Sequence, residues 1–181
     1  MSAMRSSSAA EPRRSDYLPG KDAPASPQSQ APRPRWHAGL TSTISGMQAR
    51  KLGLKPGHRV SLDDAPSGWT FADPPGGLET VGAPEPADVI VAFFARAADL
   101  SPRLPGLAQR IFPDGAIWAA WPRRAGGHTS DITDTVVREH ALALGLVDVK
   151  VAAIDEDWSG LRLVWRRENR TRRPAGPKAA S

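Results

Sequence analysis

The run DVIVAFFA, residues 88–95, decides the fold, because every position after its first residue is apolar. A strand that is apolar at consecutive positions is buried on both faces, as in a parallel sheet covered by helices. The run AIWAAW, residues 116–121, has the same character. Between the two runs, apolar residues recur at the three- and four-residue spacing of one helix face: Leu100, Leu104, Leu107, Ala108 and Ile111. Strand, helix and strand in this order predict a crossover unit of a parallel sheet.

The pattern continues towards the end of the chain. A second helix is predicted from the apolar positions Ile132, Val136, Val137, Ala141 and Leu144. A strand over 147–154 follows, and residues 155–160 connect it to another strand over 161–165. This connection is too short for a crossover helix, so the two strands are predicted to form an antiparallel hairpin with the last strand at the edge of the sheet.

The first part of the domain is less regular. A short helix, capped by Ser42 or Thr43 and stopped by Gly53, is followed by a strand over 59–62. Residues 67–86 are rich in Gly and Pro, so we expect one or two short strands within a long irregular connection. Together the elements predict a three-layer, Rossmann-like α/β domain over residues 39–167 with a mostly parallel sheet that ends in an antiparallel hairpin.

Charge separates this domain from the two ends of the chain. The chain has 24 basic and 19 acidic residues, but residues 1–40 hold 6 and 3 of these, and residues 166–181 hold 6 and 1. The middle is therefore net acidic, and the basic balance comes from the ends. Residues 1–38 and 168–181 are predicted to be disordered tails, because they offer little apolar area to offset the entropy of ordering. These tails are expected to associate weakly with nucleic acid, in a salt-dependent manner.

Several classes of protein are excluded by composition. The chain has no Cys, which excludes disulfides, thiolate zinc sites and a cysteine nucleophile. The longest apolar run, 89–95, has seven residues, whereas a membrane helix needs about 20. The N-terminus lacks the apolar stretch of a secretory signal, so we expect a cytoplasmic protein. We find no phosphate-binding loop or nucleophile elbow.

Four stretches resemble a bacterial family known as domain of unknown function 3052. They are KLGLKPGHRVSLDDAP (51–66), PADVIVAFFARAADL (86–100), WPRRAGG (121–127) and TDTVVREHALALGLVDVKVAAIDEDWSGLRLVWRR (133–167). That family in turn resembles the Rossmann-like fold of methyltransferases that use S-adenosylmethionine. The resemblance implies a fold and makes S-adenosylmethionine a possible cofactor, but it implies no settled activity.

The turn after the first strand departs from the pattern of working methyltransferases. In those enzymes an acidic residue and a glycine-rich turn let the cofactor approach the backbone. Here Asp63, Asp64 and Pro66 occupy this turn, and Gly68 is its only glycine. Glu79 is a poor candidate for the acidic residue that would hold the ribose. The sequence therefore argues against ordinary cofactor binding.

A ligand site is expected where the carboxyl ends of the strands meet, because open α/β sheets bind ligands there. The polar and aromatic residues that follow the predicted strands are the candidates for ligand binding: Asp63, Asp64, Arg96, Trp121, Arg123, Arg124, His128, Asp155, Trp158 and Ser159.

Each candidate also has a structural interpretation. Arg123 and Arg124 suit a phosphate or carboxylate ligand, or else form ion pairs with the acidic hairpin 155–157. Trp158 is predicted either to stack on a planar ligand or to plug the hairpin. Without a nucleophile beside it, His128 is more simply an exposed loop residue, and Asp63 with Asp64 is a weak magnesium signal. Neither a catalytic residue nor a metal ligand is assigned.

Two functions follow as hypotheses. The leading one is a module that binds a small ligand or a protein and has lost cofactor chemistry. The alternative is an S-adenosylmethionine-dependent methyltransferase with an atypical cofactor turn. The first predicts that Trp69 or Phe71 fills the space at the ends of the first and fourth strands, whereas the second predicts an open pocket there.

Overall fold

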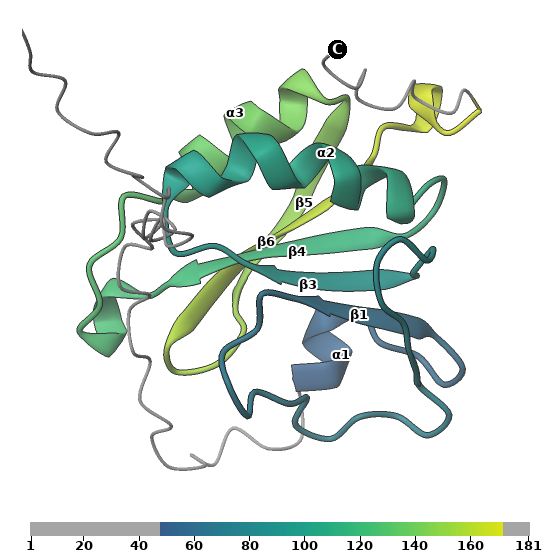
Figure 1. Cartoon of the computed structure of the whole chain (residues 1–181), viewed down its shortest axis with the longest axis horizontal. Helices are drawn as coiled ribbons and strands as arrows, with labels where there is room; N and C mark the ends of the chain where they lie inside the picture. The colour runs from purple at the N-terminus through teal and green to yellow at the C-terminus, as the bar shows by residue number, and fades with distance from the viewer. Residues whose placement is uncertain (1–47, 172–181) are drawn as a thin grey trace, which may run out of the picture. The chain divides into compact units, whose positions relative to one another are not determined.

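A six-stranded sheet, in the order β2-β1-β3-β4-β6-β5, organises residues 48–171, the part of the chain that the computed structural model describes (Figure 1). In chain order the elements are α1 (Gln48–Leu52), β1 (Arg59–Asp63), β2 (Glu79–Thr80), β3 (Val89–Phe93), η1 (Ala97–Asp99), α2 (Leu100–Arg110), β4 (Ala116–Pro122), η2 (Arg124–Gly126), α3 (Asp134–Ala143), β5 (Leu146–Ala153), β6 (Trp158–Trp165) and η3 (Arg167–Asn169). Strands β2, β1, β3 and β4 pair in parallel, and β6 is antiparallel to both of its neighbours.

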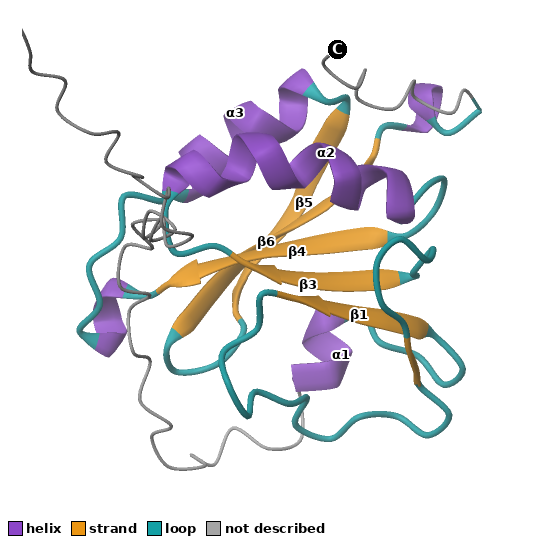
Figure 2. Cartoon of the chain, viewed as in Figure 1, coloured by secondary structure: helices purple, strands orange, loops and turns teal. Residues whose placement is uncertain are grey.

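The two central strands are buried on both faces, as their continuous apolar sequence predicts. Every residue of β3 and of β4 is buried. On one face, α2 and α3 cover the sheet with Leu100, Leu104, Val137 and Ala141. On the other face the cover is α1 and the connection between β1 and β2 (Figure 2). The predicted three-layer, mostly parallel α/β fold with a terminal antiparallel hairpin is confirmed.

The predicted position of the antiparallel strand is wrong. Strand β6 lies between β4 and β5, so β5 and not β6 forms the edge of the sheet. The physical reason is the distribution of apolar residues. Leu161 and Leu163 of β6 are fully buried, whereas Val149 and Val151 of β5 are 52% and 53% exposed. Strand β6 also begins at Trp158, so Trp158 and Ser159, which were expected in the loop, belong to the strand.

The predicted tails and the helix cap at Ser42 or Thr43 lie mostly outside the described residues. Of the predicted C-terminal tail, residues 168–171 are described. The Asn169 side chain donates a hydrogen bond to the Gly145 carbonyl at 3.0 Å, and Arg170 donates to the Trp165 carbonyl at 3.1 Å. Asn169 and Arg170 therefore contact the domain, whereas Glu168 and Thr171 are exposed.

The connection into β4 is tightly packed at Gly115, and a substitution there tests this packing. A Cβ added to Gly115 would lie 2.8 Å from the Ala87 carbonyl oxygen and 2.9 Å from that of Ile111. Because both atoms belong to the backbone, they move only if the strand moves. We expect Gly115→Ala to lower the free energy of unfolding by about 1–3 kcal/mol, measured by urea denaturation.

Gly76→Ala is the matched control. A Cβ at Gly76 has no atom within 4 Å, and its backbone does not have a positive φ. Its free energy of unfolding should stay within about 0.5 kcal/mol of the unchanged protein. Equal losses in the two variants would contradict the packing around Gly115.

Candidate functional site

An indole ring occupies the carboxyl end of β3, between the ends of β1 and β4. Trp69, in the connection after β1, packs edge-on against Phe93 of β3 with ring centroids 5.0 Å apart. Phe71 packs edge-on against Trp69 with ring centroids 5.2 Å apart, and Trp158 packs edge-on against Phe93 at 4.9 Å. We call Trp69, Phe71, Phe93 and Trp158 the aromatic cluster. It lies on the face of the sheet that α1 covers.

Directed hydrogen bonds fix the connection that carries Trp69 and Phe71. The Trp69 Nε1–H donates to the Asp155 Oδ2 atom at 2.7 Å. The Gln48 side chain, which is buried in α1, accepts from the Ala72 backbone N–H at 2.6 Å and donates to the Ile154 carbonyl at 2.9 Å. Because these bonds join the connection to two separate elements, Trp69 is held in place rather than lying loosely on the sheet.

The same Asp155 carboxylate organises the β5–β6 hairpin. Its Oδ1 atom accepts the backbone N–H groups of Asp157 at 2.9 Å and of Trp158 at 2.8 Å. With Oδ2 engaged by Trp69, both oxygens of Asp155 have structural partners. Trp158 itself is only 5% exposed. Of its two predicted roles, plugging the hairpin matches this burial, and stacking on a ligand from solvent does not.

The two arginines after β4 differ from the predicted ion pairs. Arg123 Nη1 donates to the backbone carbonyls of Asp155 at 3.1 Å and Glu156 at 3.4 Å, and not to their carboxylates. Arg124 is exposed and forms no ion pair within residues 48–171. The structure therefore uses Arg123 to join the β4 loop to the hairpin.

The remaining candidates are spread over this end of the sheet. His128 Nε2 lies 2.9 Å from Asp157 Oδ1, which ties the loop after η2 to the hairpin. Arg96 pairs with Asp99 at 3.0 Å and is exposed. Trp121 is buried on the α2 face, and Ser159 is half-buried beside it on β6.

Asp63 and Asp64 are engaged by a residue that the sequence analysis did not select. Arg103 of α2 forms an ion pair with Asp63 and lies 3.5 Å from an Asp64 oxygen. Its Nη1 atom also donates to the Phe93 carbonyl at 2.9 Å, and its guanidinium carbon lies 4.4 Å from the Phe94 ring centroid. Arg103 therefore links the carboxyl ends of β1 and β3 and occupies the two carboxylates.

Asp64 itself takes the left-handed conformation that a glycine would adopt at lower cost, with φ 54°. A cofactor-binding turn would present bare backbone at this position. Here the turn after β1 carries the exposed Asp64 side chain beside Arg103 instead.

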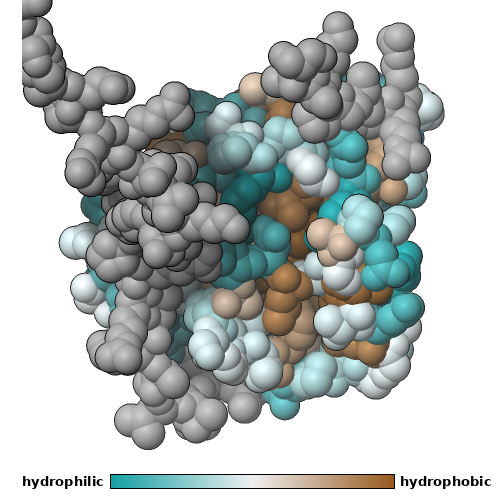
Figure 3. All heavy atoms as spheres, viewed as in Figure 1, coloured by the Kyte–Doolittle hydropathy of each residue, from teal (hydrophilic) through white to brown (hydrophobic). Residues whose placement is uncertain are grey.

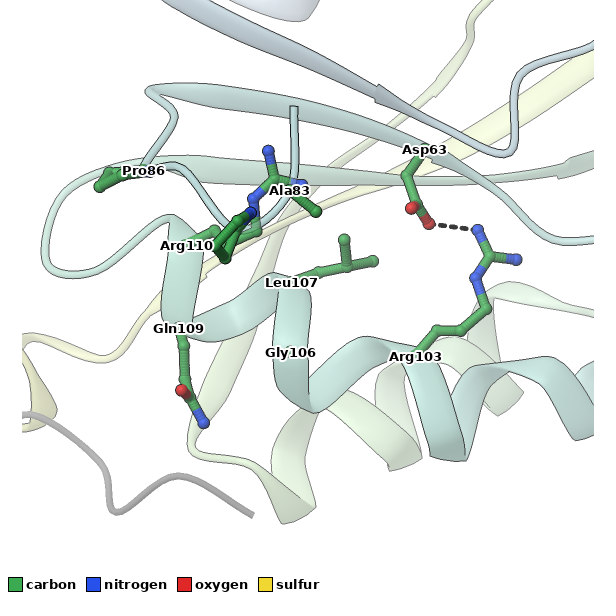
Figure 4. A pocket seen from close by; sticks show the side chains of 9 residues that line it. Asp63, Ala83, Pro86, Arg103, Gly106, Leu107, Gln109 and Arg110 are labelled. Carbon is green, nitrogen blue, oxygen red and sulfur yellow. Dashed lines mark hydrogen bonds and ion pairs between the residues drawn. The ribbon is translucent and has the colours of Figure 1, made fainter. Parts of the chain in front are cut away.

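A pocket of about 450 Å³ opens on the α2 face, beside the end of β1. Its walls are Asp63 of β1, the loop before β3 and one stripe of α2 (Figure 4). Its lining residues are Asp63, Ala83, Pro84, Pro86, Arg103, Gly106, Leu107, Gln109 and Arg110. Asp63 is the only predicted site residue among them.

This pocket was not predicted from the sequence, because its two arginines lie on α2, a helix that was identified by its apolar residues alone. Arg103, Gly106, Leu107 and Arg110 follow the spacing i, i+3, i+4 and i+7, so they share a face beside that stripe. The sequence did contain a signal for Arg103, because two adjacent carboxylates at a strand end attract a cation and Arg103 lies on the next α-helix in the structure.

Residues 48–171 contain neither a cluster of metal-binding side chains nor a helix suited to cross a membrane. No group of three or more His, Asp or Glu side chains is placed to hold a metal ion. No helix in this region combines the length and the apolar character that crossing a membrane requires.

Comparison with known proteins leaves the family open. No protein-family model matches the chain, and no curated protein matches it. The resemblance to family 3052 therefore stays a prediction.

Among solved structures, the chain is similar to magnesium protoporphyrin IX methyltransferase from Synechocystis with bound SAH, at 12% identity and a TM-score of 0.37. The match covers 54% of each chain, so this protein spans about half the length of that enzyme. A LepI complex with SAH and a substrate analogue matches at 13% identity and a TM-score of 0.41, over 65% of this chain and 39% of the other.

A methyltransferase candidate from Thermoplasma acidophilum matches at 9% identity and a TM-score of 0.40, over 68% of this chain and 77% of the other. The fold assignment above rests on the strand order and pairing of this chain.

The burial of Trp158 gives a prediction for the aromatic cluster. Trp158→Ala should lower the free energy of unfolding by about 3–5 kcal/mol, the range for truncation of a core aromatic residue, measured by thermal or urea unfolding.

Two controls separate packing from other effects. Trp158→Phe keeps a ring against Phe93 and should lose less stability, and Arg124→Ala, on the exposed loop, should change it by less than about 0.5 kcal/mol. If Trp158→Ala lowered the free energy of unfolding as little as Arg124→Ala does, Trp158 would not be a core residue.

Proposed function

We propose that this protein is a small-ligand-binding module that performs no methyl transfer. The observation that carries the proposal is the position of Trp69, whose indole packs on Phe93 at the carboxyl end of β3 and hydrogen bonds to Asp155. In an open α/β sheet this is the region where a nucleotide-like cofactor lies. A cofactor bound at the end of β3 on the α1 face would therefore have to displace Trp69.

The chemistry around the first turn supports the same proposal. The two carboxylates after β1 are paired with Arg103, so binding a ribose or an amino group there requires breaking an existing ion pair. The side chains at this end of the sheet mainly join one loop to another: Trp69 to Asp155, Arg123 to the hairpin carbonyls, and His128 to Asp157. These contacts stabilise the loops at this end of the sheet.

The pocket beside α2 supplies the ligand-binding part of the proposal. Its volume of about 450 Å³ is within the usual range for small-molecule sites, roughly 300–1,000 Å³. It lies on the α2 face, whereas the aromatic cluster lies on the α1 face. A ligand can therefore bind without displacing Trp69.

Isothermal titration calorimetry of the full chain with S-adenosylmethionine and S-adenosylhomocysteine tests the proposal. We expect no saturable heat for either compound at concentrations up to about the millimolar range, because Trp69 and the Arg103 ion pairs occupy the region that each compound would need.

The opposite outcome would support an atypical methyltransferase. Saturable micromolar binding, weakened by Asp63→Ala or Asp64→Ala, would overturn the proposal. Asp73→Ala is the matched control for Asp64→Ala, since both residues have a left-handed backbone, with φ 51° and 54°. Binding that Asp73→Ala leaves intact would then be assigned to the turn after β1 and not to backbone strain.

A further inference from the structure

Arg110 places a positive charge in the wall of the pocket beside α2. The residue is only 8% exposed. Its Nε atom donates to the Glu85 carbonyl at 2.8 Å, and its Nη2 atom donates to the Ser61 hydroxyl at 2.8 Å and the Gly82 carbonyl at 3.1 Å. All three acceptors are neutral. The hydrogen bonds hold the guanidinium in position but do not neutralise it.

The carboxylates near Arg110 are engaged elsewhere. Asp63 forms its ion pair with Arg103, and Glu85 lies 3.9 Å from Arg59. Among residues 48–171 no carboxylate forms an ion pair with Arg110. Arg103, the other arginine of the pocket, already has the two carboxylates after β1. The unneutralised charge of the pocket is therefore that of Arg110.

Holding such a charge away from water is costly unless an anion accompanies it. Burial lowers the pKa of the Arg110 guanidinium, and the more distant carboxylates of Asp63 and Glu85 oppose that shift. An anion bound at contact distance would relieve the same desolvation cost. The geometry points in the same direction, because Arg110 keeps a donor for such a group.

That donor is Nη1. It makes no hydrogen bond to any described residue, and it is not fully shielded from solvent. Arg110 borders both the 450 Å³ pocket and a smaller neighbouring one of about 250 Å³. An anion that enters from solvent meets a guanidinium already oriented by three hydrogen bonds, so little entropy is lost in ordering it.

Besides Arg110, the larger pocket is lined by the ion-paired Asp63 and Arg103 and by Gln109, and its remaining lining residues are apolar or glycine. Leu107 points into the space between Asp63 and Arg110, and Ala83 and Pro86, from the loop before β3, line the pocket on the side of Arg110 (Figure 4). Gly106 lies on the α2 stripe between Arg103 and Arg110, and a Cβ there would meet no atom within 4 Å. In Figure 3, apolar residues reach the surface between α2 and α1, with hydrophilic residues around them.

We propose that this pocket binds a small organic anion, whose charged group pairs with Arg110 while its apolar body packs against Leu107, Ala83 and Pro86. The proposal deepens the proposed function, since it rests on a small-ligand site beside α2 and names the class of ligand. Carboxylates and phosphate monoesters share the required chemistry, and the test distinguishes them.

The experiment titrates the full chain with three probes that carry the same ring: benzoate, phenyl phosphate and the neutral benzamide. We expect at least one anionic probe to bind at least tenfold more tightly than benzamide. A preference for benzoate assigns a carboxylate ligand, and a preference for phenyl phosphate assigns a phosphate ligand. Equal affinities for all three probes, or no binding at millimolar concentration, would overturn the proposal.

Variants locate the site. Arg110→Gln should reduce the affinity for the anionic probe about tenfold or more and leave benzamide unaffected. Gly106→Leu fills the larger pocket without touching the Arg110 hydrogen bonds, and it should abolish probe binding with no loss in thermal stability. Gly106→Ala is its control, because it raises helix propensity in the same way but adds little bulk. Anion binding that survives Gly106→Leu would contradict this pocket as the site.

These outcomes are separable from those of the proposed function. Equal binding of benzamide and benzoate removes the preference for anions and leaves a small-ligand-binding module. Saturable S-adenosylmethionine binding removes the proposed function whatever the probes do. If Arg110→Gln fails to fold, the Gly106 pair and the three probes still decide the proposal.

Discussion

The burial of β3 and β4 on both faces is the constraint on which the rest of this structure depends. All five residues of β3 and all seven of β4 are buried, so each face of the central sheet requires an apolar cover. Helices α2 and α3 supply it on one face. On the other face α1 has only five residues, and no helix is present between β1 and β2. The irregular connection must complete the cover, and it does so with its two aromatic side chains, Trp69 and Phe71. The position of Trp69 and Phe71 at the strand ends thus follows from a requirement of folding.

The same constraint explains where a pocket remains. On the α1 face the aromatic cluster covers the end of the sheet. The Trp69 indole donates a hydrogen bond to Asp155, and Gln48 accepts one from the Ala72 backbone, and these two bonds hold the cluster there. On the α2 face the helix covers β3 and β4 well, but β1 lies near the edge of the sheet and its neighbour β2 has only two residues. The loop before β3 crosses this gap and is held by Arg110. A cavity persists there because a short strand and a loop cannot match the packing density of a helix on a full sheet.

Sequence reasoning succeeded where the local pattern determines the structure. The continuous apolar runs fixed β3 and β4 as buried strands, and the three- and four-residue spacing fixed α2 and α3. It failed where partners come from distant parts of the chain. Trp158 was expected in a loop because the connection between the two hairpin strands was predicted to span residues 155–160. In the structure β6 begins at Trp158 and pairs with β4, and the side chain is buried. Arg123 was a candidate for binding an anion or for pairing with the hairpin carboxylates. Its hydrogen-bond acceptors are the Asp155 and Glu156 backbone carbonyls, and the spacing of residues in the sequence does not predict such contacts. Arg103 and Arg110 were hidden on a helix that had been considered only for its apolar residues.

Helix α2 contributes both to the core and to the wall of the pocket. Leu104 and Ala108 face the core, while Arg103, Gly106 and Arg110 form the adjacent stripe that borders the pocket. Arg103 fixes the stripe to β1 at one end through Asp63, and Arg110 fixes it at the other end through Ser61. The two arginines therefore hold the helix against β1 at two points, with Gly106 between them, where no side chain fills the gap. A substitution at Gly106 changes the shape of the pocket without breaking either attachment, whereas a substitution at either arginine changes both the attachment and the charge. For this reason the glycine, and not the arginines, is the position at which the proposed binding is separable from folding.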